Sequence, residues 1–216
     1  ETVMSHYKLR QHCMPQSYGI GLKEIWEVPD QQFKPGLAIH TIGWPLDHKT
    51  YGGSFVYHWT DNKVAVGYVI GLDYSNTYLN PYEEFQRFKH HPFMAKQLKG
   101  GRRTLYGSRA LNEGGFQSIP QLHFPGGLIV GCGAGFLNTP KIKGIHGAMR
   151  SGMLAAEALM EDLSWQSKPI SCERYQHKWK QSSLYHELWQ VRNIRPGFRW
   201  GLWPGLVYAG IDTYIL

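Results

Sequence analysis

The stretch FPGGLIVGCGAGFLNTPKIKGIHGAMRSGMLAAE, residues 124–157, decides the fold prediction. Its apolar run at 128–130 follows two glycines, which is typical of a short buried strand. A glycine loop follows at 131–135, and after it small residues recur at steps of three and four. This spacing predicts a helix over 143–163 with a face so small that another backbone or a flat ligand can come close.

The glycine loop is not a complete dinucleotide fingerprint. That motif needs glycines at spacings of two and three, and position 136 is Phe. The acidic residue expected about twenty positions later is missing, apart from the poorly placed Glu157. The late strand, small-residue turn and long helix of hydroxylase-like FAD enzymes fit better. There, N–H groups near 138–144 would stabilise negative charge on the reduced flavin ring, and Lys141 and Lys143 would add to this effect or point into solvent.

The segment before this stretch has the pattern of an antiparallel sheet. Extended pieces at 18–28 and 37–44 form a plausible antiparallel pair. A hairpin is predicted from 52–59 and 64–72, because apolar residues alternate in both runs and a polar turn joins them.

Helices and one loop complete the local prediction. Asn80 as N-cap and Pro81 in the first turn predict a helix that ends before Pro92. Residues 106–120, YGSRALNEGGFQSIP, contain too many glycines and too little periodicity for a regular element, so we expect a functional loop. Another helix is predicted over 172–192.

Composition limits the classes of function. The 23 Lys and Arg against 16 Asp and Glu give a net charge of +7, which suits an anionic partner such as a phospholipid surface, a dinucleotide or an acidic protein. No nucleic-acid motif is present, and neither Cys nor His residues show metal-ligand spacing, so no nucleic-acid partner and no metal site are assigned. No leader follows Glu1, and the chain stops at Leu216 within an apolar run, which predicts truncation.

Other motifs occur in a fixed order around the first stretch: SYGIGLKEIW, HTIGWPLDHKTYGGSFVYHW, VGYVIGLDYSNTYLNPYEEFQRFKHHP, YGSRALNEGGFQSIP and VRNIRPG. Together they cover 9–197 and resemble electron-transfer flavoprotein–ubiquinone oxidoreductases. The resemblance implies an enzyme that accepts single electrons from reduced electron-transfer flavoprotein. It would hold them on FAD and a [4Fe–4S] cluster, and it would reduce ubiquinone at the membrane.

The resemblance also implies site residues. Gly52 and Gly53 match the glycine pair that meets the quinone, where missing side chains would let the backbone approach a carbonyl oxygen; a plain strand-entry turn explains them equally well. Asn112 and Glu113 are predicted to contact the flavin. The other predicted cofactor-binding residues are Gly131, Cys132, Gly135, Phe136, Asn138, Thr139, Lys141 and Gly144. Cys132 replaces an Asp that holds the ribityl chain in related hydroxylases, and it is expected to be buried rather than redox-active.

The fold class that follows is α+β. We expect an antiparallel-sheet quinone domain at 1–105 with a helix at 81–91. It is joined at 106–165 to the flavin-ring half of an FAD-binding domain of the hydroxylase or glutathione-reductase type. A helix and a membrane-contacting tail are expected at 166–216.

The tail at 201–216 is too short to span a bilayer and contains Pro204 and Asp212. Arginines followed by aromatic residues instead suit a membrane surface, with an ordinary domain-edge core as the alternative: Arg192, Arg195, Arg199, Trp200, Trp203 and Tyr208. The location implied by the resemblance is the matrix side of the mitochondrial inner membrane, held peripherally, or a bacterial cytoplasmic membrane.

Two parts of the family pattern are missing from the sequence. These are the GxGxxG unit for the adenine half of FAD and the cysteines that would hold the cluster. The chain is therefore expected to be a fragment or a split-gene subunit that needs neighbouring parts. A non-catalytic structural subunit of a larger mitochondrial membrane complex is the alternative. A flavoenzyme acting on an isoprenoid lipid is a third interpretation.

Overall fold

A computed structural model describes residues 1–164 and 172–215, which form two compact units. The sheet unit comprises Tyr18–Leu111 and Trp200–Pro204. The helical unit comprises the described residues of Glu1–Ser17, Asn112–Arg199 and Gly205–Leu216.

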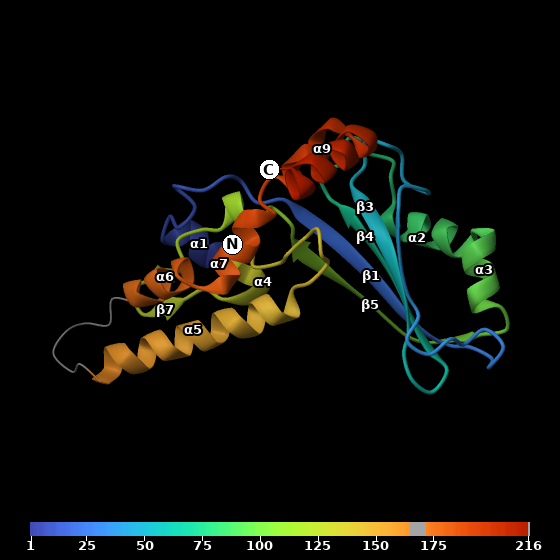
Figure 1. Ribbon diagram of the computed structural model, residues 1–216, viewed down its shortest axis with the longest axis horizontal. Coiled ribbons are helices and arrows are strands. Elements are labelled where there is room, and N and C mark those ends of the chain that lie inside the picture. The colour runs from blue at the N-terminus through green and yellow to red at the C-terminus, as the bar shows by residue number, and fades with distance from the viewer. Residues whose placement is uncertain (165–171, 216) are drawn as a thin grey trace. The chain divides into compact units, whose positions relative to one another are not determined.

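Five strands in the order β2-β3-β4-β1-β5 form the sheet unit (Figure 1). Their bounds are β1 (Tyr18–Glu27), β2 (Ala38–Ile42), β3 (Gly52–His58), β4 (Lys63–Gly71) and β5 (Arg102–Asn112). The predicted hairpin is confirmed, since β3 and β4 pair antiparallel with Val56 opposite Val66. Asp61 and Asn62 turn the chain between them with positive φ angles of 52° and 57°.

Two helices, α2 (Pro81–His90) and α3 (Pro92–Leu98), pack on one side of this sheet and close its core (Figure 1). The predicted start of α2 is confirmed, because the Asn80 side chain accepts hydrogen bonds from the backbone N–H groups of Tyr82 and Glu83. Phe85 and Phe88 of α2 are buried against alternate residues of β4: Val64, Val66, Tyr68 and Ile70.

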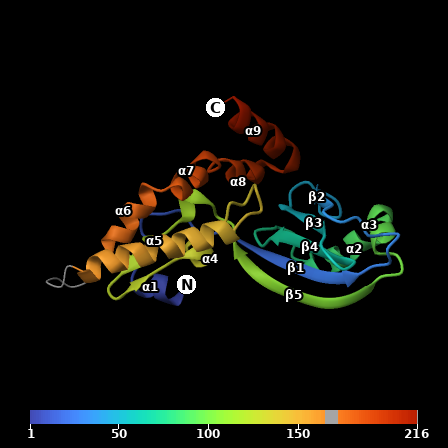
Figure 2. The same cartoon turned by 60° about the horizontal axis from the view of Figure 1, so that its bottom comes forward.

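The longest helix of the helical unit is α5 (Ile145–Ser164), which packs with α4 (Gly131–Ala134), α6 (Glu173–Lys180) and α7 (Ser183–Gln190) (Figure 2). Its smaller elements are α1 (Thr2–His6), η1 (Phe116–Ser118), β6 (His123–Phe124), β7 (Gly127–Leu128) and α8 (Ile194–Gly197). The segments η2 (Phe198–Trp200) and α9 (Leu202–Tyr214) follow. No described helix is long and apolar enough to cross a membrane.

Two predictions about the sheet were wrong. β1 does not pair with β2; it pairs antiparallel with β4, while β2 pairs with β3, because the short hairpin lets β4 lie between β3 and β1. The expected loop at 106–120 begins as a strand, since β5 continues to Asn112. Its residues face solvent and therefore lack the apolar periodicity from which a strand is predicted.

The opening stretch also differs in detail from its prediction. The apolar run at 128–130 is not a buried strand: β7 ends at Leu128, pairs only with β6, and leaves Val130 40% exposed. The glycine loop is a single helical turn, α4, closed by Gly135 in the left-handed conformation. The predicted helix over 172–192 is two helices, α6 and α7.

The units also have limits that differ from the expected domains. The first 17 residues group with the helical unit, where Met14 N–H donates to Gln117 O at 2.8 Å and Gln121 N–H donates to Leu9 O at 2.9 Å. The sheet unit extends to Leu111 rather than to 105, because β5 is long.

Candidate functional site

The α4 turn is held on α5 by a serine. Gly131 N–H donates to Ser151 Oγ at 2.9 Å, and that hydroxyl donates to Ala148 O at 2.8 Å. Gly131 has φ +64°, and a Cβ there would lie 3.4 Å from the Ala148 Cβ. Both the backbone conformation and the close approach therefore favour glycine.

The small-residue face of α5 is occupied by the chain itself. A Cβ at Gly147 would lie 2.6 Å from Phe136 O, so the backbone after α4 runs directly over this face. Phe136 is 1% exposed, and its ring lies 5.6 Å from that of Trp179 in the unit's core. The Phe136 side chain thus packs in the core, and the predicted cofactor contact of this residue stays a prediction.

Asn112 lies against the α4 turn, as a ligand-positioning role requires. Its Nδ2 donates to Cys132 O at 2.7 Å and to Gly133 O at 3.3 Å. A methyl group at Gly133 would meet no described atom within 4 Å, and Cys132 is half-buried rather than buried as expected. A flat group can therefore approach the backbone of this turn without displacing a side chain.

Gln16 connects the two glycine-containing loops, and no local sequence pattern indicates this role. Its Oε1 accepts hydrogen bonds from Gly114 N–H at 2.6 Å and from Ser118 Oγ at 3.2 Å. A Cβ at Gly135, which has φ +92°, would lie 3.3 Å from the Gln16 Nε2. The neighbouring Glu113 is 2% exposed and fixed through its N–H, which donates to Ser17 O at 2.8 Å.

Glu187 organises the turn before α5, and this residue was also missed. Its carboxylate accepts from Asn138 Nδ2 at 2.7 Å, lies 3.0 Å from His146 Nε2, and lies 3.6 Å from Lys141 Nζ. Burial alone would raise the pKa of Glu187, but the hydrogen bonds from His146 and Asn138 outweigh burial and hold this pKa below its ordinary value. The carboxylate is therefore ionised at neutral pH.

The turn at 138–143 precedes α5 and is not part of this helix. Asn138 and Lys143 pair backbone to backbone, and α5 starts only at Ile145. Within the described residues the Thr139 hydroxyl is buried without a hydrogen-bond partner. A Cβ at Gly144 would lie 3.0 Å from the Leu137 side chain, so Gly144 serves local packing. A buried hydroxyl without a partner in the described residues can hydrogen-bond a polar ligand group.

Gly52 and Gly53 lie in the sheet unit, where pairing with β2 stops. Gly53 is opposite Ile42, the last residue of β2, and both glycines are half-buried. A Cβ at Gly52 would lie 2.5 Å from Leu46 Cδ1, and one at Gly53 would lie 2.6 Å from Thr41 O. Sheet packing alone therefore requires glycine here, while the end of β2 leaves the adjoining backbone accessible.

Similar sequences among known proteins establish the family of the chain. Residues 18–111 match the family model described as ETF-QO, ubiquinone-binding. Over 219 residues the chain is 53% identical to the mitochondrial electron transfer flavoprotein-ubiquinone oxidoreductase of Homo sapiens. The matching region is 97% of this chain and 36% of the human protein. The chain belongs to the electron transfer flavoprotein-ubiquinone oxidoreductase family. The protein of the same name from Arabidopsis thaliana is 51% identical over 100% of this chain and 34% of its own length.

The chain thus spans about a third of the length of the curated relatives that it matches. Among solved structures, a geranylgeranyl bacteriochlorophyll reductase-like protein from Thermoplasma acidophilum gives a TM-score of 0.65 at 15% identity, over 92% of this chain and 52% of that one. A flavin-dependent brominase gives 0.57 at 18% identity, over 92% and 48%. These likenesses show the fold alone: a mixed α and β architecture with an antiparallel sheet.

Proposed function

We propose that this chain is the quinone-side and flavin-ring part of an electron transfer flavoprotein-ubiquinone oxidoreductase. The carrying observation is the match of 18–111 to the ubiquinone-binding family model, together with the 53% identity to the human enzyme over 97% of the chain. The complete enzyme would pass electrons from reduced electron transfer flavoprotein through FAD and a [4Fe–4S] cluster to ubiquinone. Neither the cluster ligands nor the adenine-binding unit is assigned to this chain.

The flavin ring would lie against the α4 turn. Support comes from the open backbone at Gly133, the half-buried Cys132 and the orphaned hydroxyl of Thr139. FAD, when bound, supplies a group that accepts and releases single electrons. The protein contributes fixed backbone dipoles: Asn112 and Ser151 hold α4, and Glu187 holds the turn that follows.

The quinone would meet the sheet at Gly52 and Gly53. Support comes from the match of 18–111 to the ubiquinone-binding family model and from the end of β2 pairing at Ile42, beside which both glycines are only half-buried. The relatives from Homo sapiens and Arabidopsis thaliana are mitochondrial by name, and we propose a peripheral position at the matrix side of the inner membrane. This membrane contact would be made by the exposed aromatic and aliphatic residues of 200–215, described below.

The proposal is tested on the native protein, purified from the cells that produce it. We expect the purified native protein to show flavin absorbance near about 450 nm, a property of the cofactor. The flavin should be reduced by reduced electron transfer flavoprotein and reoxidised by a soluble ubiquinone. Absence of flavin with firm attachment to other chains would contradict this proposal and favour the structural-subunit alternative. Intact mass of the same sample tells whether 216 residues is the whole polypeptide.

A further inference from the structure

Strand β5 is an exposed sheet edge in the part of the chain that the structure describes. It stands at the end of the strand order, and its first nine residues, 102–110, are all exposed. Leu105 and Tyr106 are 65% and 80% exposed. An edge strand offers a row of backbone N–H and C=O groups with which another extended chain can pair. The length of β5 makes this edge suitable for strand addition.

The charge of β5 is one-sided. Its sequence RRTLYGSRALN contains three arginines and no carboxylate, within a chain of net charge +7. Arg102 pairs with Glu27 at 3.1 Å, and Arg103 pairs with Glu24 at 3.1 Å. An incoming strand opposite β5 therefore meets cationic side chains, which favours acidic residues at those positions.

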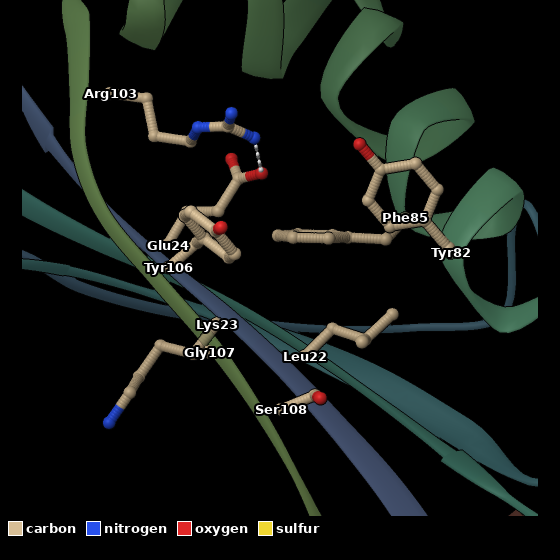
Figure 3. A pocket seen from close by; sticks show the side chains of 9 residues that line it. All are labelled: Leu22, Lys23, Glu24, Tyr82, Phe85, Arg103, Tyr106, Gly107 and Ser108. Carbon is tan, nitrogen blue, oxygen red and sulfur yellow. Dashed lines mark hydrogen bonds and ion pairs between the residues drawn. The ribbon is translucent and has the colours of Figure 1, made fainter.

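A cleft of about 550 Å³ lies between β5 and α2. Tyr82 and Phe85 enter it from α2, while Arg103 and Tyr106 enter it from β5; the Lys23 side chain points away (Figure 3). Leu22 and Phe85 supply an apolar wall. The cleft can therefore take one apolar side chain beside a polar group.

The cation at the cleft is Arg103. The Glu24 carboxylate is 3% exposed and accepts hydrogen bonds from Lys89 Nζ at 2.8 and 2.9 Å and from Trp26 Nε1 at 2.8 Å, in addition to Arg103. Two cations thus face one carboxylate. The Arg103 side chain is 42% exposed and its guanidinium lies 5.1 Å from the Tyr106 ring centre. Because a guanidinium has five N–H donors, Arg103 can bind a second carboxylate while keeping the first.

We infer that β5 and this cleft form a docking surface for an extended, acidic segment of a protein partner. The segment adds to β5 as a further strand. One of its carboxylates contacts Arg103, and an apolar side chain two residues away, on the same face of the added strand, enters the cleft against Phe85 and Leu22. A small anion would use only the charge of Arg103. A peptide would also use the exposed edge of β5 and the aromatic rings of Tyr82 and Tyr106 at the cleft.

The experiment is a fluorescence anisotropy titration of the full chain with a labelled peptide of about ten residues, Glu-Thr-Val-Thr repeated, so that Glu and Val alternate along one face of the strand. We expect saturable binding. The same peptide N-methylated at every residue keeps its charge but cannot donate backbone hydrogen bonds to β5 from either edge, and it should bind at least about tenfold more weakly. Equal binding of the two peptides, or no binding of the first, would overturn the inference.

Variants locate the surface. Arg103→Gln should raise the peptide's Kd about tenfold, because it removes a charge-assisted hydrogen bond. Arg102→Gln is the matched control, since it removes the same charge from the adjacent residue, whose partner is Glu27 outside the cleft. Its Kd should stay within about twofold of wild type. Equal losses in the two variants would show attraction by net charge only and would contradict docking at the cleft. Circular dichroism of both variants verifies folding.

Discussion

Buried charge in the sheet unit comes from one residue, Glu24, whose partners lie on three elements. Lys89 comes from α2, Trp26 from the same strand, and Arg103 from β5. Burial by itself would raise the pKa of Glu24, but the hydrogen bonds from Lys89 and Trp26 outweigh burial and hold this pKa below its ordinary value. The cluster is therefore charged at neutral pH and depends on all of its members.

Removing the lysine tests this cluster. Lys89→Met should lower the free energy of unfolding at pH 7 by about 3 kcal/mol, because it leaves a buried carboxylate with less compensation. The Lys89 side chain is 9% exposed, so solvent offers little replacement. Arg87→Met on the same helix removes an exposed pair with Glu84 and should cost less than about 1 kcal/mol. Urea unfolding of both variants gives the comparison, and equal losses would contradict this account.

The pH dependence has a definite sign. Since the folded pKa of Glu24 is depressed, its contribution to stability is present above the unfolded pKa of 4.5 and is lost as pH falls through the folded value. The penalty of Lys89→Met should therefore shrink in urea titrations below pH 4.5, where Glu24 becomes neutral. A penalty that is constant down to acid unfolding would show that the lysine acts through packing and not through charge.

Single residues of the candidate cofactor site were only partly predictable. Asn112 was assigned to the site because its motif resembles a family motif; its side chain donates to the α4 backbone, and its flavin contact stays a prediction. Gln16 and Glu187 were missed because their partners lie 98 and 49 residues away in the chain. Such contacts leave no local pattern. Phe136 was assigned to the site because it follows the glycines, but its side chain is buried and packs in the core of the helical unit.

At the scale of elements, patterns predicted the hairpin β3–β4, the start of α2 and the long helix α5. Each has a local cause: alternation, an N-cap, or small residues at helical spacing. β5 was missed because its hydrogen-bonding partner β1 is distant in sequence and its side chains face solvent. The α4 turn was missed because the contact between Gly131 and Ser151 sets its shape, not the glycine spacing alone.

Helix α9 provides a prediction about membranes. Large apolar side chains of 200–215 are strongly exposed, at 65% for Trp200, 69% for Trp203, 65% for Val207 and 87% for Tyr214. Indole and phenol rings favour the boundary between head groups and acyl chains. We expect the protein to sediment with vesicles containing anionic lipid. The double variant Trp203→Ser, Val207→Ser should shift the partition constant at least about fivefold toward solution.

A matched control uses exposed apolar residues elsewhere. Met149→Ser, Met153→Ser removes two side chains of α5 that are 65% and 52% exposed. Its vesicle binding should remain close to that of the unaltered protein. If this control lost as much binding as the α9 variant, general hydrophobicity rather than α9 would account for membrane attachment.

At the scale of the whole molecule, sequence similarity to the family supports the proposed function more strongly than any single site does. The chain matches relatives over nearly all of its own length but over about a third of theirs. Within the chain, the quinone-side glycines and the α4 turn belong to different units. The division of the chain into these two units could not be predicted from composition. Residues 1–17 belong to the helical unit because their backbone hydrogen-bonds to residues 117 and 121, which are distant in sequence.

The central claim, that the sheet unit binds ubiquinone at Gly52 and Gly53, is tested most directly by NMR of the chain with ¹⁵N-labelled glycine. Substitution is a poor test, because a Cβ at either glycine would strike the sheet. Among the 25 glycines, titration with a soluble short-chain ubiquinone should shift the amide signals of Gly52 and Gly53 most, in a saturable manner. Signals of Gly36 and Gly100, which lie outside the strands, should stay in place. Saturable shifts centred on other glycines, or no shifts at all, would contradict the claim.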